Sequence, residues 1–285
     1  WPGGVKFRAS RFLDSMPASE DPIFFSHLKA RLDGIEKATC TLVNTFEELE
    51  ESSLKATMCE TPVRYIGPLA PTPLENNATI RANLFCEEIE SLNWLDKQAQ
   101  SSVIYISFGS VASLTQDQIQ VLALGIESSK QPFLWVLRDS IIDTLEGFIE
   151  RTSARGLIIK WAPQARVLSH PSVGGFLTHC GWNSVLESIH MGVPMLCFPL
   201  FGDQCLNALL IEDVWKLGLP LHKGKDGRMV GNEVEKAIIS LMKSEDIKER
   251  ASRWKVRSHR AIQQGGTSNI AMESIILDLR KGLTI

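Results

Sequence analysis

The sequence predicts an α/β protein built around a Rossmann-like parallel sheet with helices on both faces. Short runs rich in β-branched and aromatic residues alternate with amphipathic helical segments, and the connections between them are short. This alternation is typical of parallel sheets that are buried on both sides. The 285 residues are 44% hydrophobic and carry a net charge of −3, which gives no electrostatic reason to expect nucleic acid. No apolar run is long enough to span a bilayer.

The first part of the chain contains one strand–helix–strand unit. Residues 38–44 form a β-branched run that predicts a buried strand, and residues 63–66 predict a second short strand. Between them, residues 46–55 carry apolar side chains at helical spacing. A linker follows, because residues 70–82 contain two prolines and two asparagines and show no periodicity.

After the linker, strands and helices alternate regularly. Strands are predicted at 103–108, 133–137, 157–160, 174–178 and 195–199. Helices are predicted after a capping box at Thr115–Gln118 and at 147–153, 165–168, 183–191, 206–217, 231–243, 246–263 and 267–280. Ligands of such sheets bind outside the carboxyl ends of the strands, so functional residues are expected directly after each strand. No G-x-G-x-x-G motif follows any strand, which argues against a dinucleotide site.

The six cysteines form no C-x-x-C pair and show no spacing typical of a disulfide framework. We therefore expect free thiols and a cytoplasmic location. A zinc site is the alternative, because five possible ligands lie fairly close in sequence: His170, His179, Cys180, Cys197 and Cys205. The spacing typical of metal ligands is missing, so we expect no metal.

Two segments at strand ends carry groups suited to a nucleotide. Trp161 follows the strand 157–160, and its indole can offer a flat face to a heterocyclic base, with ordinary packing as the alternative. The segment from His179 to Ser184 follows the next strand and opens a helix, where free N–H groups and the helix dipole create an anion site. Its glycine lets a phosphate approach the backbone closely. Ordinary capping by Asn183 is the alternative.

Further positions could complete such a site. Glu187 lies four residues after Asn183 on the same helical face, where its carboxylate could accept hydrogen bonds from a ribose or remain a solvated surface group. Asp203 and Gln204 follow a strand and could hold pairs of sugar hydroxyls, with helix capping by Asp203 as the alternative. Ser110, in the turn after the first strand of this region, could donate to a diphosphate or belong to a plain turn.

The segment from Trp161 to Gln204 resembles the signature box of plant family-1 UDP-dependent glycosyltransferases, with the motifs WAPQ, HCGWNS, E and DQ intact. The stretches VNTFEELE, YIGPL, WLDKQ, VIYISFGSV and QQGGTSN resemble the same family, so the resemblance covers nearly the whole chain. It implies a GT-B fold with two Rossmann-like domains. Residues 1–69 would be the end of an incomplete N-terminal acceptor domain, and residues 70–92 a linker. Residues 93–265 would be a C-terminal UDP-sugar donor domain. Residues 266–285 would form a helix that packs back on the N-terminal domain.

The resemblance also implies a UDP-sugar site and a reaction. The resemblance implies that Trp161 and Ala162 contact the uracil, and that Gln164 and Glu187 contact the ribose. The diphosphate contacts His179, Asn183, Ser184 and Ser110. The sugar contacts Trp182, Asp203 and Gln204. A hexose moves from the UDP-sugar to a hydroxyl of a small lipophilic acceptor, such as a phenolic or a terpenoid, with inversion. The final Gln of the box often accompanies glucose as the donor sugar. No cofactor is implied, since the UDP-sugar is a co-substrate.

In this family the general base toward the acceptor hydroxyl is a histidine near the amino terminus, held by an aspartate. Nothing in this chain resembles that segment, so we assign no catalytic residue and expect the chain alone to turn over slowly or not at all. One alternative is a non-catalytic UDP-sugar-binding protein, or half of a split enzyme with a separate N-terminal half as its partner. Another is a nucleotide-sugar epimerase or other dinucleotide enzyme, which would need the missing glycine motif.

Overall fold

The chain divides into two compact units, residues 1–70 with 254–285 and residues 71–253. The predicted linker at 70–92 lies mostly outside the residues that the computed structural model describes. The described residues are 26, 34, 38–54, 61–69, 86–109, 114–137, 142–222 and 230–280.

The first unit contains a two-stranded parallel sheet and its helices. Strands β1 (Thr41–Val43) and β2 (Val63–Tyr65) pair in parallel, and helix α3 (Glu47–Leu54) connects them. Helix α13 (Thr267–Arg280) contacts β2, and a 2.5 Å side-chain hydrogen bond joins this helix to the loop after β2. The strand–helix–strand order predicted from the apolar pattern is confirmed.

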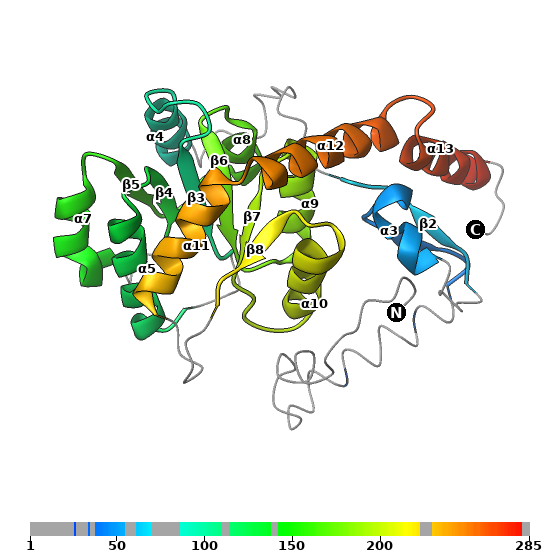
Figure 1. The fold of residues 1–285 in the computed structure, drawn as a ribbon. Helices are drawn as coiled ribbons and strands as arrows, with labels where there is room; N and C mark the ends of the chain where they lie inside the picture. The colour runs from blue at the N-terminus through cyan, green and yellow to red at the C-terminus, as the bar shows by residue number, and fades with distance from the viewer. Residues whose placement is uncertain are drawn as a thin grey trace. The chain divides into compact units, whose positions relative to one another are not determined.

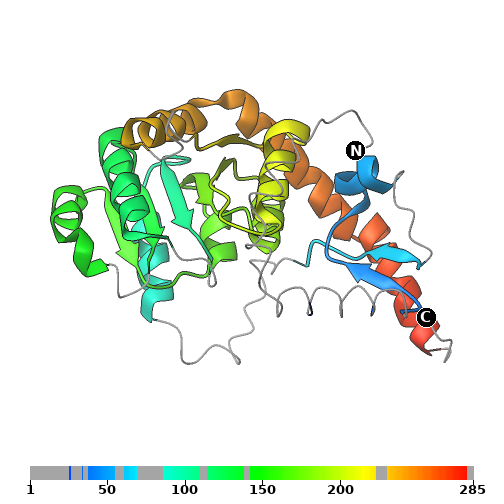
Figure 2. The same cartoon turned by 90° about the horizontal axis from the view of Figure 1, so that it is seen from below.

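The second unit is built on a six-stranded parallel sheet with the order β5-β4-β3-β6-β7-β8 (Figure 1, Figure 2). Its strands are β3 (Val103–Ser107), β4 (Phe133–Val136), β5 (Gly156–Ile159), β6 (Val173–Thr178), β7 (Met195–Cys197) and β8 (Gly218–Pro220). The chain begins the sheet at β3, adds β4 and β5 on one side, and then places β6, β7 and β8 on the other. The strand order therefore reverses between β3 and β6, and the crevice at such a switch point is where open parallel sheets bind ligands.

Strands β3 to β7 lie within two residues of their predicted positions, whereas β8 was not predicted. This strand has only three residues and contains a glycine and a proline, which interrupt the apolar pattern by which strands are found. The prediction of one helix over 206–217 is also wrong. Helix α10 (Gln204–Leu209) starts two residues earlier, and the chain continues as a π-helix from Leu210 to Val214.

Helices α5 (Gln116–Ser129) and α11 (Gly231–Lys243) pack against each other and cover one face of this sheet. The predicted capping box starts α5, since the side chains and backbone N–H groups of Thr115 and Gln118 bond each other reciprocally. The core between these helices and the strands contains fully or almost fully buried apolar side chains: Ile104, Ile106, Ile119, Leu122, Ile126, Trp135, Val234 and Ile238.

The other face of the sheet carries the elements that form the site. Side chains alternate along a strand, so Tyr105 of β3 points away from the α5 core, and it stacks on Phe176 of β6 with ring centroids 5.0 Å apart. Helix α8 (Gln164–Ser169) contacts β6 and helix α9 (Trp182–Met191). Helix α9 ends at Gly192 in the left-handed conformation, as its sequence predicts.

The remaining α-helices with described bounds are α4 (Cys86–Leu95), α7 (Glu146–Thr152) and α12 (Glu245–Ile262), and a 3-10 helix (Asp143–Leu145) precedes α7. Of these, α12 begins in the second unit and ends in the first. Within the described ranges, every helix is too short or too polar to cross a membrane.

Candidate functional site

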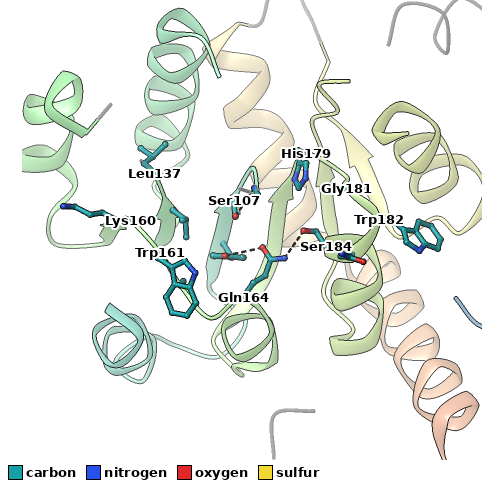
Figure 3. Close-up of a pocket in the computed structure, with 14 residues that line it drawn as sticks. Ser107, Leu137, Lys160, Trp161, Gln164, His179, Gly181, Trp182 and Ser184 are labelled. Carbon is teal, nitrogen blue, oxygen red and sulfur yellow. Dashed lines mark hydrogen bonds between the residues drawn. The ribbon is translucent and has the colours of Figure 1, made fainter. Parts of the chain in front are cut away.

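A cavity of about 740 Å³ opens at the carboxyl ends of the central strands, beside the switch point between β3 and β6 (Figure 3). Its lining residues are Tyr105, Ser107, Gly109, Val136, Leu137, Lys160, Trp161, Ala162, Gln164, His179, Gly181, Trp182, Asn183 and Ser184. In the view of Figure 3, Gln164 and His179 lie between Trp161 and Trp182. The structure thus brings together most of the residues predicted for the site.

Helix α9 starts at this cavity without a side-chain cap. Its N-cap residue is Gly181, so Asn183 lies inside the first turn, and the alternative that Asn183 caps the helix is wrong. The first N–H groups of a helix have no intrahelical partner and carry the positive end of the helix dipole. This end of α9 can therefore bind an anion in the cavity.

His179 follows β6 directly and packs between two glycines. A Cβ atom added at Gly109 would lie 2.9 Å from its Cε1, and one added at Gly181 would overlap its Nε2. Burial lowers the pKa of His179, and the carboxylate of Asp203 opposes this in part. Its Nδ1 is buried and has no hydrogen-bond partner within the described part of the chain. The neutral imidazole can donate one hydrogen bond to an anion.

Gln164, the first residue of α8, links three elements through its side-chain amide. Its Nε2 donates to the Oγ of Ser184 at 2.8 Å (Figure 3). It also donates to the Oε2 of Glu187 at 2.7 Å, and both acceptors lie on α9. Its Oε1 accepts a long hydrogen bond of 3.5 Å from the Tyr105 hydroxyl on β3. The two amide hydrogens are thus directed at α9, and they fix the start of α8 against it.

Glu187 does not line the cavity, but its carboxylate accepts a hydrogen bond from the lining residue Gln164. Burial raises its pKa, and the hydrogen bond from Gln164 opposes this rise. The carboxylate of Glu187 is therefore partly buried and hydrogen-bonded. The alternative interpretation, a solvated surface glutamate, is wrong. Glu187 can accept hydrogen bonds from a diol only where a ligand displaces or joins the Gln164 amide.

Trp161 is the second residue after β5, and it is 39% exposed at the cavity. This exposure excludes burial in the core as the reason for an indole at this position. The next residue, Ala162, is buried, and both residues line the cavity. An exposed indole in a lined cavity is suited to stacking on a flat ring.

Asp203 and Gln204 are the N-cap residue and the first residue of α10, and both lie outside the residues that line the cavity. Asp203 is the N-cap residue of α10, but its side chain makes no capping hydrogen bond and instead accepts one from Asn207 at 2.8 Å. The Oε1 of Gln204 accepts hydrogen bonds from the backbone N–H groups of Leu200 and Phe201. Ser110, also predicted for the site, lies outside the described residues.

Five lining residues were not predicted: Tyr105, Ser107, Val136, Leu137 and Lys160. Val136, Leu137 and Lys160 lie at the ends of β4 and β5, and functional residues are expected at the carboxyl ends of the strands. The other two lie inside the buried run of β3, where only the polar Ser107 gives a signal in the sequence.

The cysteines whose side chains the structure describes are free thiols: Cys40, Cys180, Cys197 and Cys205. Within the same ranges, no group of three or more His, Cys, Asp or Glu side chains is placed to hold a metal ion.

Comparison with known proteins adds a family to this geometry. A family model described as UDP-glucoronosyl and UDP-glucosyl transferase matches residues 26–260. The limonoid UDP-glucosyltransferase of Citrus unshiu is 35% identical over 277 residues, which cover 93% of this chain and 54% of that protein. The cinnamate beta-D-glucosyltransferase of Fragaria ananassa is 36% identical over 279 residues, covering 93% and 50%. The chain spans about half the length of the curated relatives it matches.

Among solved structures, UGT2 of Phytolacca americana, complexed with UDP-2fluoro-glucose and pterostilbene, superimposes with a TM-score of 0.85 at 32% identity. The match covers 97% of this chain and 62% of that chain. Neighbours of this kind have the GT-B fold, so the predicted fold class is confirmed.

Proposed function

This chain belongs to the UDP-glucoronosyl and UDP-glucosyl transferase family, and from that premise we propose that its second unit binds the donor UDP-glucose in the cavity beside α9. The whole protein would transfer the glucose, with inversion, to a hydroxyl of a small lipophilic acceptor such as a phenolic or a terpenoid. The relatives named as limonoid and cinnamate glucosyltransferases support this class of donor and acceptor. A solved relative complexed with UDP-2fluoro-glucose and pterostilbene supports it as well.

The observation that carries the proposal is the uncapped start of α9 inside a cavity that also exposes an indole. A diphosphate needs N–H donors and a positive potential, and a base needs a flat apolar face. Helix-end donors would also stabilise the charge that develops on the leaving diphosphate during transfer, in a step that needs no metal.

We propose the following arrangement of UDP-glucose. The uracil contacts Trp161 and Ala162, and the ribose contacts Gln164 and Glu187. The diphosphate contacts His179, Asn183, Ser184 and Ser110. The sugar contacts Trp182, Asp203 and Gln204. The Gln164–Glu187 hydrogen bond of 2.7 Å supports the pairing of these two residues at the ribose, because the two polar groups lie close enough to hold one diol.

We assign no catalytic residue, because no segment of this sequence resembles the one that carries the general base in the family. A cytoplasmic location, in which the thiols stay reduced, is part of the same proposal.

Isothermal titration calorimetry of the chain with UDP-glucose, UDP and NAD tests the proposal. We expect binding of the two uridine ligands at a stoichiometry of one, and no binding of NAD. A Trp161→Ala variant should bind both uridine ligands more weakly. Binding of NAD without binding of UDP would overturn the proposal in favour of a dinucleotide enzyme. Rapid glycosylation of a panel of phenols by this chain alone would show that a general base is present and was overlooked.

A further inference from the structure

Asn207 connects two segments of the proposed donor site from behind. It lies on α10 and is only 4% exposed, so its side chain belongs to the interior. Its Nδ2 donates one hydrogen bond to the carbonyl oxygen of Cys180 at 2.9 Å and one to the Oδ2 of Asp203 at 2.8 Å. An amide NH2 group has two hydrogens, so both are used by these two acceptors.

The first acceptor belongs to the turn that presents the start of α9. Cys180 stands between β6 and the N-cap of the helix, and its φ of +63° is in the left-handed region, which non-glycine residues rarely adopt. Its N–H donates to the hydroxyl of Thr178 at 3.1 Å, and its carbonyl accepts from Asn207. These two hydrogen bonds stabilise a turn that would otherwise be disfavoured. The direction in which α9 presents its N–H groups depends on this turn.

The second acceptor is the carboxylate proposed to hold the sugar. Asp203 lies four residues before Asn207, at the spacing at which side chains meet on one face of a helical turn. The hydrogen bond from Asn207 occupies its Oδ2 and restricts the rotation of its carboxylate. The same carboxylate is close enough to His179 to act on the pKa of the imidazole.

We propose that Asn207 is a positioning residue that sets the sugar-binding carboxylate against the diphosphate-binding helix start. It acts through Asp203 and Cys180 and is not among the residues that line the cavity. A UDP-sugar spans both subsites, whereas UDP lacks the sugar. Loss of Asn207 should therefore change the affinity for UDP-glucose more than the affinity for UDP. The proposal rests on the proposed function, because it needs UDP-glucose to occupy this cavity.

The test is a double-mutant cycle on the ratio of UDP-glucose affinity to UDP affinity, measured by calorimetry on the full chain. Asn207→Ala should lower this ratio by about tenfold, as expected for loss of a hydrogen bond to a charged group. In an Asp203→Ala background, the same substitution should change the ratio by less than about twofold, because its route to the sugar is gone. A purely structural defect would weaken both ligands equally and leave the ratio unchanged.

Two further variants keep the test decisive. Asn207→Leu has nearly the same size and no donor, so it should reproduce the lowered ratio if the alanine variant does not fold. Asn232→Ala removes an exposed amide on α11 and should leave both affinities unchanged. An unchanged ratio in folded Asn207 variants, or an equal drop with and without Asp203, would overturn the positioning role alone. Failure of the unaltered chain to bind UDP-glucose would overturn the proposed function as well.

Discussion

Replacement of Glu187 by Ala should weaken the binding of UDP. The Oε2 of Glu187 accepts a 2.7 Å hydrogen bond from Gln164, and burial raises the pKa of this carboxyl. The substitution removes the proposed acceptor of the ribose hydroxyls and leaves one hydrogen of the Gln164 amide without its partner. A buried polar group without a partner costs about 1–3 kcal/mol, so the Kd for UDP should rise about 5- to 150-fold.

Calorimetry with UDP and 2′-deoxy-UDP separates ribose recognition from general damage to the site. The unaltered chain should prefer UDP, and the preference should shrink in Glu187→Ala because the deoxy ligand already lacks one of the hydroxyls. Glu187→Gln is the matched control, since it keeps an oxygen acceptor while removing the negative charge, and its loss should be smaller. An unchanged Kd for UDP, or a preference for UDP that persists in Glu187→Ala, would refute the assignment of this residue to the ribose.

Burial lowers the pKa of His179 in the folded state below its ordinary value of 6.5. The unfolded chain therefore binds a proton more readily at this residue, and the free energy of unfolding should fall as the pH drops below about 6.5. Urea unfolding at several pH values should show a smaller fall for His179→Asn; an equal fall would count against this residue. Gly109→Ala should destabilise the chain by more than Gly265→Ala, because both glycines have positive φ but only a Cβ at Gly109 would meet His179, at 2.9 Å; urea midpoints that move equally would contradict that contact. Trp161→Ala should weaken UDP binding by about 1–3 kcal/mol through lost stacking, and Trp161→Phe should retain most of the affinity; calorimetry that finds the two variants alike would argue against stacking.

Much of the second unit could be predicted from the sequence because its central strands are buried on both faces. Such strands are continuous apolar runs, and β3 and β6 are buried along their whole length. Helix boundaries were visible where the chemistry is local, as in the capping box before α5 and the left-handed Gly192 after α9. The strand β8 and the π-helix after α10 were missed, because neither has a local pattern that distinguishes it from a loop or an α-helix.

The site was predictable only as a set of strand ends. The topology of a parallel sheet brings those ends to one edge, which is why Trp161 and His179 could be expected near each other. The hydrogen bonds within the site could not be predicted from the sequence. Those of Gln164 and Asn207 join segments that are distant in sequence, and nothing local indicates which side chain faces which. Tyr105 was missed because a buried tyrosine fits an apolar strand without any functional reason.

A crystal structure of the chain with UDP bound tests the central claim most directly. The account predicts the diphosphate at the start of α9, within hydrogen-bond distance of the backbone N–H groups there, with the uracil stacked on Trp161 and the ribose at Gln164 and Glu187. UDP bound elsewhere on the chain, or a cavity that stays empty in crystals that hold UDP at another place, would contradict it.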